Sequence, residues 1–341
     1  MALPTSMGRS RQPSASPRTS SRRTRSSHVL RRSWVTDTIR VVKQPHLPAF
    51  VLAAASLLHL LACGGAQPSA SPERPAPPGN NLRLYVFDCG SLNVDPVRFR
   101  LTKEEVATTE LSAPCFLIAH PQGRLIWDPG AVPDADWVPT GDPVVHHLVL
   151  PDLGERDVTL RKPLMAQLSE AGYSPGDITY LAFSHYHWDH TANANGFAGA
   201  TWLVRQVERD AMFAEKTPGV TRPSTYAALK NSKTVIIPSD EHDVFGDGSV
   251  IMKLAAGHTP GHQVLYVKLP TTGGVVLSGD LYHFPEARTL KRVATFDFDQ
   301  AQSSVSRDAI EAFLAKTGAQ LWIQHDHVGN TRLKKAPEYY E

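Results

Sequence analysis

Cysteine is scarce in this chain, which has only three in 341 residues: Cys63, Cys89 and Cys115. That number is too small for a fold held together mainly by disulfides, and no Cys-x-x-Cys pair indicates a zinc ribbon. Cys89 and Cys115 each lie in an apolar segment typical of a β-strand, so we expect them to be buried thiols. A disulfide between them is the alternative if the protein folds in an oxidising compartment.

A long hydrophobic run is also missing. The longest, residues 49–62, has 14 residues, whereas a transmembrane helix needs about 20. This run, behind a basic segment, is typical of the apolar region of a signal peptide. It ends in Leu-Leu-Ala-Cys-Gly at residues 60–64, which resembles a bacterial lipoprotein signal in which Cys63 would carry the lipid. We therefore predict an exported protein that contacts the membrane only through a lipid anchor at Cys63.

The chain beyond its N-terminal segment has no surplus of basic residues. Residues 1–45 hold ten Arg or Lys and one acid, and this basic leader has the composition of a disordered segment. The rest of the chain has 25 basic and 32 acidic residues, so its net charge is near −7. An acidic body does not fit nucleic-acid binding.

Histidine, by contrast, is concentrated in one short segment. Residues 184–190, Ser-His-Tyr-His-Trp-Asp-His, follow the apolar run 178–183, which predicts a buried strand that ends at the histidines. In an extended chain, residues two apart point the same way, so His185 and His187 can bind one cation. After the chain turns, Asp189 and His190 can face a second. Imidazole and carboxylate together suit zinc and related divalent metals.

Three further segments place a potential ligand at the end of an apolar strand. They are Gly-His-Thr-Pro-Gly-His at 257–262, Ser-Gly-Asp at 278–280 and His-Asp at 325–326. Strands come first and mixed strands and helices follow, twice over, which predicts an α/β fold of two packed sheets with helices outside. Residues 131–160 are rich in Pro, Asp and Trp, and we expect a loop beside the active site with His146 and His147 on its surface.

The order of these four motifs resembles the metallo-β-lactamase fold superfamily over about residues 82–330. The resemblance implies a four-layer αββα sandwich and two divalent metal ions, with zinc the expected metal. The implied ligands are His185, His187 and His258 for the first ion, Asp189, His190 and His325 for the second, and Asp280 between them. Such a pair would share a hydroxide that attacks the substrate. His262 is expected to be structural, and His327 at most to support a ligand.

Within the superfamily, residues 84–90, 277–284 and 322–326 and the compact C-terminal end resemble the N-acyl-homoserine lactonase branch. The resemblance implies a small-molecule substrate, a lactone or ester, and the implied reaction is hydrolytic opening of the lactone ring. Another hydrolase on the same scaffold, acting on aryl esters, thioesters or organophosphates, is the main alternative. A metal-binding lipoprotein without turnover is the third interpretation.

The resemblance also implies catalytic side chains. Lactonases of this branch commonly have a tyrosine three residues after the bridging aspartate, whereas this chain has His283 there, with Tyr282 beside it. We expect one of the two to donate a hydrogen bond to the developing oxyanion. Asp189 is expected to transfer a proton to the leaving alkoxide.

The predicted organisation therefore has four parts. A basic leader (residues 1–45) precedes a lipoprotein-type signal segment (46–63) and a Pro- and Ser-rich tether (64–80), whose composition is typical of a flexible spacer. The hydrolase domain of the metallo-β-lactamase type then spans residues 81–341.

Overall fold

The computed structural model describes residues 81–341 of the chain. The leader, signal segment and tether predicted for residues 1–80 lie outside the described residues. Within residues 81–341, no helix combines the length and the apolar character needed to cross a membrane.

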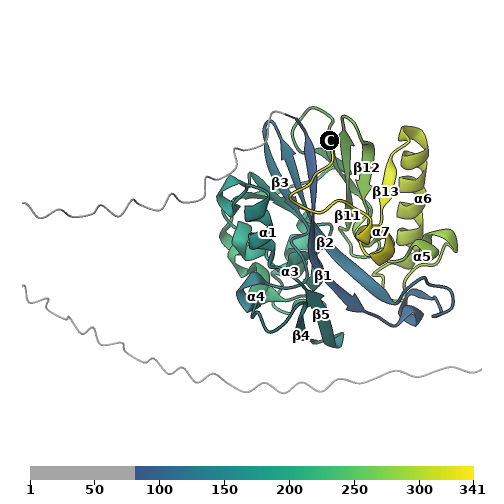
Figure 1. Ribbon diagram of the computed structural model, residues 1–341. Helices are drawn as coiled ribbons and strands as arrows, with labels where there is room; N and C mark the ends of the chain where they lie inside the picture. The colour runs from purple at the N-terminus through teal and green to yellow at the C-terminus, as the bar shows by residue number, and fades with distance from the viewer. Residues whose placement is uncertain (1–80) are drawn as a thin grey trace, which may run out of the picture. The chain divides into compact units, whose positions relative to one another are not determined.

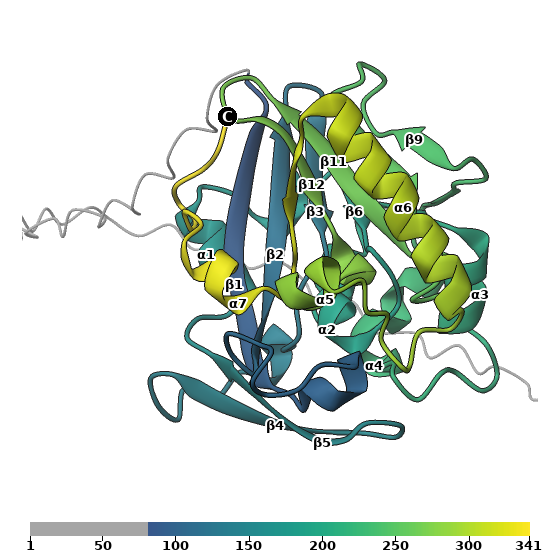
Figure 2. The ribbon, with the colours of Figure 1, turned by 90° about the vertical axis from the view of Figure 1, so that its right-hand side faces the viewer.

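Two β-sheets lie face to face at the centre of the fold (Figures 1 and 2). The larger sheet has eight strands in the order β4-β5-β1-β2-β3-β6-β7-β8 and the smaller has five in the order β13-β12-β11-β10-β9. The strands of the larger sheet are β1 (Arg83–Asn93), β2 (Glu110–His120), β3 (Gly123–Trp127), β4 (Val144–Leu150), β5 (Gly154–Leu160), β6 (Tyr180–Ala182), β7 (Thr201–Val204) and β8 (Thr234–Ile236). The strands of the smaller sheet are β9 (Glu241–Asp243), β10 (Val250–Leu254), β11 (Gln263–Leu269), β12 (Gly273–Leu277) and β13 (Gln320–Trp322).

Helices cover the outer face of each sheet, as Figure 1 shows. The α-helices are α1 (Leu164–Glu170), α2 (Trp188–Thr191), α3 (Gln206–Met212), α4 (Pro223–Tyr226), α5 (Pro285–Thr289), α6 (Gln300–Thr317) and α7 (His327–Thr331). Helices α1 and α3 lie against the larger sheet, and α5 and α6 lie on the side of the smaller sheet. The predicted α/β fold with a four-layer αββα sandwich is thereby confirmed.

Alternation along β1 produces two of the hydrophobic layers. Leu84 and Val86 point between the sheets, into a cluster that includes buried side chains of β11 and β12. Tyr85 and Phe87 point the other way, toward the apolar face of α1. Because successive side chains of a strand face opposite sides, one apolar strand can serve both layers. Each fully buried aliphatic or aromatic side chain contributes about 1.5–3 kcal/mol.

The third hydrophobic layer joins α6 to the smaller sheet. Ile310 and Leu314, four residues apart on one face of the helix, pack with Tyr266 and Val276. The helix begins at Asp299, whose carboxylate accepts a hydrogen bond from the backbone N–H of Gln302, and such caps stabilise a helix by about 1 kcal/mol.

The loop expected over residues 131–160 is instead largely a β-hairpin, β4 and β5, at the edge of the larger sheet. Side chains of β4 alternate strictly between buried and exposed positions. His146 takes an inward position and packs against Trp137, so the expectation that it lies on the surface is wrong. His147 is exposed, as expected, and its Nδ1 lies 2.8 Å from an oxygen of Asp157. Because a polar histidine occupies one of the buried positions of β4, its sequence does not show the alternation of apolar and polar residues that predicts a strand.

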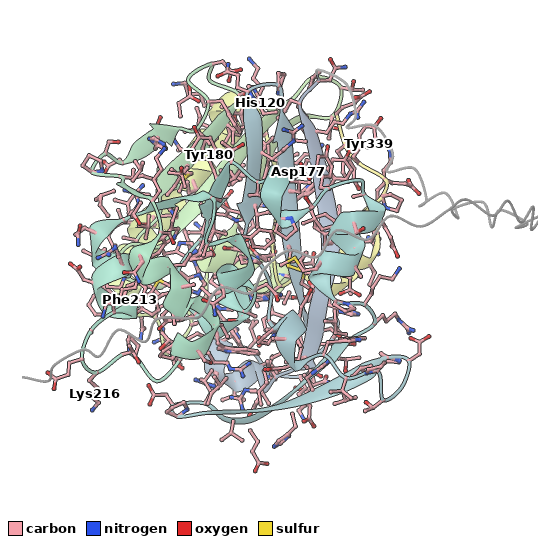
Figure 3. The ribbon with its side chains drawn as sticks, turned by 90° about the vertical axis from the view of Figure 1, so that its left-hand side faces the viewer. His120, Asp177, Tyr180, Phe213, Lys216 and Tyr339 are labelled. Carbon is pink, nitrogen blue, oxygen red and sulfur yellow. A yellow bond between two sulfur atoms is a disulfide. The ribbon has the colours of Figure 1, made fainter. Side chains whose placement is uncertain are left out.

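Cys89 and Cys115 form a disulfide, with their Cα atoms 5.8 Å apart, so the expectation of free thiols is wrong. Both side chains are buried between neighbouring strands β1 and β2, and the bond is the yellow one in Figure 3. The register of the two strands shifts between Asp88 and Ser91, so regular alternation does not reveal the pairing. Gly130 packs directly on the bond: a Cβ there would lie 2.7 Å from the Cβ of Cys89.

Replacing both Cys89 and Cys115 with alanine should lower the free energy of unfolding by about 3 kcal/mol, because the bond closes a loop of 26 residues in the unfolded chain. Denaturant titration with and without reductant measures this. Reductant should lower the midpoint of the wild type and leave the double variant unchanged. If complete reduction left the wild-type midpoint unchanged, the disulfide would not stabilise the fold.

Candidate metal centre

The predicted ligands meet at one edge of the two sheets, because each follows the carboxyl end of a strand. His185 comes three residues after β6, His258 four after β10, Asp280 three after β12 and His325 three after β13. Strands β12 and β13 are parallel, and β10 runs the same way because β11 lies antiparallel to both β10 and β12. The short helix α2 carries Asp189 and His190 to the same edge.

Asp280 is the centre of this cluster. Its Oδ1 lies 3.0 Å from His190 Nε2 and 2.9 Å from His325 Nε2. Its Oδ2 lies 3.1 Å from His258 Nε2 and 3.0 Å from His283 Nε2. The two oxygens of one carboxylate therefore face two different groups of histidines.

The remaining predicted ligands complete these two groups. His185 Nε2 lies 3.6 Å from Asp280 Oδ2, and His187 Nδ1 lies 3.1 Å from His258 Nε2. On the other side, Asp189 Oδ2 lies 3.8 Å from His325 Nε2. The structure thus brings all seven predicted ligands together. Within each group the donor atoms lie within 4.8 Å of one another; the groups are His185, His187, His258 and Asp280, and Asp189, His190 and His325. A third group that meets the same distance is Asp280, His283 and His325, and its His283 was not among the predicted ligands.

The donor atoms fit a pair of divalent cations. His185 Nε2, His190 Nε2 and Asp280 Oδ1 are buried, and despite their proximity none of them has a hydrogen bond of acceptable geometry within the described residues. Buried polar atoms without a partner are rare because they cost free energy, and cations between the two groups would satisfy them. Imidazole nitrogens and carboxylate oxygens are ligands that zinc and other first-row metals accept.

Acceptors behind the histidines orient the rings. Asp128 Oδ2 lies 3.0 Å from His190 Nδ1, and Asp297 Oδ1 lies 2.9 Å from His258 Nδ1. The carbonyl oxygen of Ser112 lies 2.6 Å from Nδ1 of His325. Each of these bonds holds the proton on Nδ1 and turns Nε2 toward the cluster, the arrangement that a metal-binding imidazole requires.

Two of these acceptors were not found from the sequence. Asp128 follows directly on the apolar strand β3, the same signal that marked His185 after β6, and it also accepts a 2.6 Å hydrogen bond from the N–H of Ser184. Asp297 lies in a connection without any regular pattern, between α5 and α6, and no signal marked it.

The charges of the cluster depend strongly on one another. Burial raises the pKa of a carboxyl, yet the surrounding imidazoles, His325 and His190 foremost, hold the pKa of Asp280 well below its usual range. Burial, reinforced by neighbouring imidazoles, holds the pKa of His185 and of His187 well below the ordinary value. Burial opposes protonation of His258 too, but Asp280 and Asp297 raise its pKa to about 9. The neutral imidazoles of His185 and His187 have the protonation state that metal binding needs.

The structure separates the two candidate catalytic neighbours. His283 faces the cluster through the contact with Asp280. Tyr282 points away: its hydroxyl donates a 3.0 Å hydrogen bond to Glu311, and its ring packs under Arg307. Tyr282 therefore cannot donate to a substrate in the cleft, and this alternative for the oxyanion donor is wrong.

The two remaining histidines have supporting or separate positions. His262 Nε2 accepts a 2.9 Å hydrogen bond from the N–H of Asp280, and its Nδ1 lies 2.9 Å from the carbonyl oxygen of Ala255. This is the structural role expected for it. His327 lies 3.5 Å from Glu110 and contacts none of the ligands among the described interactions.

A buried carboxylate joins the two histidine-bearing loops. Glu208 Oε2 accepts a hydrogen bond of 3.0 Å from the N–H of Tyr186, which stands between His185 and His187. Its Oε1 accepts from the hydroxyl of Thr259 and the N–H of Gly261, both at 2.7 Å. Burial raises the pKa of Glu208 to about 7, against the effect of these three donors. An acid on the buried face of α3, four residues before Met212, was a signal available in the sequence.

A cleft of about 380 Å³ opens beside the cluster. His187, Asp189, His258, Asp280, His283 and His325 form its floor. Much of the remaining wall is apolar, including Leu92, Phe99, Leu111 and Phe296. A concave site with apolar walls and a few convergent polar groups is typical of a small-molecule active site.

The fold and the donor set together define a class of protein. Residues 108–319, more than half of the chain, match the family model of the metallo-beta-lactamase superfamily. The chain belongs to this superfamily, and it is a metal-dependent hydrolase.

More particular similarities follow from curated relatives. The chain is 28% identical over 269 residues to the N-acyl homoserine lactonase AttM of Azorhizobium caulinodans, an alignment that covers 76% of this chain and 99% of the relative. It is 24% identical over 266 residues to the N-acyl homoserine lactonase AiiA of Bacillus thuringiensis subsp. kurstaki, covering 75% and 98%.

Solved structures share the fold. A B. thuringiensis AiiA mutant with N-decanoyl-L-homoserine bound at its active site superposes with a TM-score of 0.63 at 22% identity, covering 76% of this chain and all of that one. AidC, a dizinc quorum-quenching lactonase in complex with a product, gives a TM-score of 0.54 at 17% identity, covering 76% and 94%.

Replacing Glu208 with glutamine should lower the free energy of unfolding by about 1–3 kcal/mol, because the amide group would present N–H to at least one of the three donors that Glu208 now accepts from. Chemical denaturation measures the change. Asp210→Asn is the control, since Asp210 is an exposed acid on the same helix whose side chain accepts a hydrogen bond from Gln206 and from no other residue of the described range 81–341. Equal stability of Glu208→Gln and wild type would show that the carboxylate does not hold the two loops.

Proposed function

We propose that this protein is a dinuclear metal-dependent hydrolase that opens the lactone ring of N-acyl-homoserine lactones. The observation that carries the proposal is the Asp280 carboxylate, whose two oxygens face two separate groups of metal-binding side chains at the floor of a cleft. The similarity to curated lactonases over nearly their whole length favours this substrate over other esters.

In this proposal the ligands form two metal sites that share Asp280. His185, His187 and His258 would hold one ion, and Asp189, His190 and His325 the other. Bound divalent ions would supply Lewis acidity to the scissile carbonyl and lower the pKa of the attacking water. Asp128 and Asp297 keep the imidazoles oriented through the reaction.

The side chains around the ions have separate tasks. The apolar wall, with Leu92, Phe99 and Phe296, excludes water and covers an acyl chain. His283 donates a hydrogen bond to the oxyanion that develops as water adds to the carbonyl. Asp189, which also lines the cleft, takes a proton from the attacking water and passes it to the ring oxygen as the bond from that oxygen to the carbonyl carbon breaks, and the product is the open hydroxy acid.

Replacing Asp280 with asparagine should lower kcat/KM for N-hexanoyl-homoserine lactone by about a thousandfold, since several kcal/mol of charge stabilisation depend on the bridging carboxylate. Metal analysis should find two divalent ions per chain in the wild type and fewer in the variant. His147→Ala, which removes an exposed histidine outside the cleft, is the control and should match the wild type. Intact lactone after long incubation with fully metal-loaded wild type would refute the proposal, and fast turnover of an aryl ester or phosphotriester would favour the alternative hydrolases.

Replacing His283 with phenylalanine should lower kcat by about a hundredfold with little change in KM, because the ring is kept and the N–H donor is lost. His283→Tyr, which restores a donor, should recover part of the rate. Tyr282→Phe is the matched control: it should keep kcat within about twofold and cost about 1 kcal/mol of stability, since only the bond to Glu311 is lost. The reverse ranking of His283→Phe and Tyr282→Phe would contradict the assignment.

We also propose that the protein is exported and tethered through a lipid on Cys63. The lipoprotein-like segment at residues 60–64 supports this, and so does the Cys89–Cys115 disulfide, because such bonds persist in oxidising compartments. In a bacterial host, the wild type should fractionate with membranes and be released by detergent but not by salt, whereas Cys63→Ser should not be anchored. Wild-type protein found in the cytoplasm with both core thiols free would overturn the proposal.

A further inference from the structure

Two arginines reach the catalytic cleft from different elements. Arg98 belongs to the short 3-10 helix η1 (Pro96–Phe99), and Arg156 belongs to β5 at the edge of the larger sheet. Both side chains line the same cleft as Asp280 and His283. Two guanidinium groups therefore stand in the wall of a site whose floor is the metal centre.

Arg98 stacks on an aromatic ring whose other neighbours are histidines of the centre. Its guanidinium carbon lies 4.9 Å from the ring centroid of Phe296. The same ring lies 5.5 Å from the ring of His283 and 5.8 Å from that of His258. One aromatic ring thus separates the guanidinium from the imidazoles, and stacking fixes a group that is otherwise long and flexible.

Neither guanidinium has an acidic partner among residues 81–341. Arg156 donates a 2.6 Å hydrogen bond to the carbonyl oxygen of Glu155, and no carboxylate in the described part of the chain lies within ion-pair distance of Arg156 or Arg98. Asp95, also in the cleft wall, uses its Oδ1 to cap η1 through the N–H of Val97. By contrast, Arg222, Arg288 and Arg292 each pair with a carboxylate elsewhere.

The two arginines are also close enough to repel each other. Desolvation lowers the pKa of Arg156, and the charge of Arg98 lowers it further. Two like charges that line one cleft repel each other, and an anion between them would relieve that repulsion. Guanidinium groups bind carboxylate, sulfate and phosphate through paired N–H donors.

We propose that Arg98 and Arg156 form an anion-binding subsite, and that the preferred substrate carries a carboxylate, sulfate or phosphate group at the end remote from the scissile ester. This inference rests on the proposed function, whose simple N-acyl lactone substrate is neutral and would leave both guanidinium groups unpaired. Apolar side chains of the same cleft, among them Leu153 and the 70% exposed Phe298, cover the chain between ester and anion. The substrate class is therefore an anionic amphiphile that contains a lactone or ester.

The test compares two lactones that differ only at the chain end. One is an N-acyl-homoserine lactone whose six-carbon acyl chain ends in a carboxylate, and the other has a terminal amide in its place. The metal-loaded wild type should prefer the carboxylate in kcat/KM by about 10- to 100-fold, the range expected for a charge-assisted pair. Arg98→Met combined with Arg156→Met should abolish the preference while the amide substrate reacts within about threefold of wild type. Arg161→Met, which removes an exposed arginine just after β5 and outside this cleft, should keep the preference.

A binding measurement separates this inference from the proposed function. Calorimetry with hexyl sulfate, below its critical micelle concentration, should show binding to wild type and Arg161→Met that weakens at least tenfold in the double variant. If no lactone is hydrolysed but this difference in binding remains, the proposed function fails and the anion subsite stands. If lactones are hydrolysed but the double variant changes neither the substrate preference nor hexyl sulfate binding, the subsite is refuted. Circular dichroism and thermal midpoints confirm that each variant is folded.

Discussion

The structure depends on one buried carboxylate. Asp280 is almost inaccessible to solvent, and a charge in that position would be unstable without the imidazoles around it. The backbone that positions the Asp280 side chain is tightly constrained. Gly279 before it has a φ of +49°, and a Cβ there would lie 2.5 Å from the Cβ of Ser184 and 2.7 Å from Nε2 of His262. The backbone turn, the contact with the β6 loop and the hydrogen bond from the Asp280 N–H to His262 are therefore parts of a single arrangement.

Three further acids turn this cluster into a rigid unit. Asp128 joins the end of β3 to the loop after β6, Asp297 joins the approach to α6 to the loop after β10, and Glu208 joins that loop to Tyr186. Each lies behind the histidines and accepts from N–H or O–H donors. Burying an acid costs free energy unless such donors compensate it. The hydrogen bonds of these acids offset the cost and hold the candidate ligands, which come from separate elements, close to the geometry that a metal ion requires.

The ligands could be predicted because their chemistry coincides with the ends of apolar strands, a pattern that survives in a linear sequence. Features that depend on the direction in which a side chain points could not be predicted from the sequence. Tyr282 and His283 are neighbours, yet one faces Glu311 on α6 and the other faces Asp280. The disulfide lies at a register shift of β1, and β4 has a histidine at an inward position. Each case requires the register or the tertiary neighbours, which a periodicity argument does not contain.

The proposed chemistry and the proposed choice of substrate depend on different parts of the molecule. The candidate metal-binding side chains come from segments that follow strand ends and from α2, where any shift disturbs several hydrogen bonds at once. The far wall of the cleft comes from η1 and the β4–β5 hairpin, which lies at one edge of the larger sheet as Figure 2 shows. Arg98 and Arg156 belong to this wall, and their guanidinium groups form no ion pair within residues 81–341. If the proposed anion subsite is correct, substitutions there would change which substrate binds while the ligands stay in place, because one fold supports many substrates.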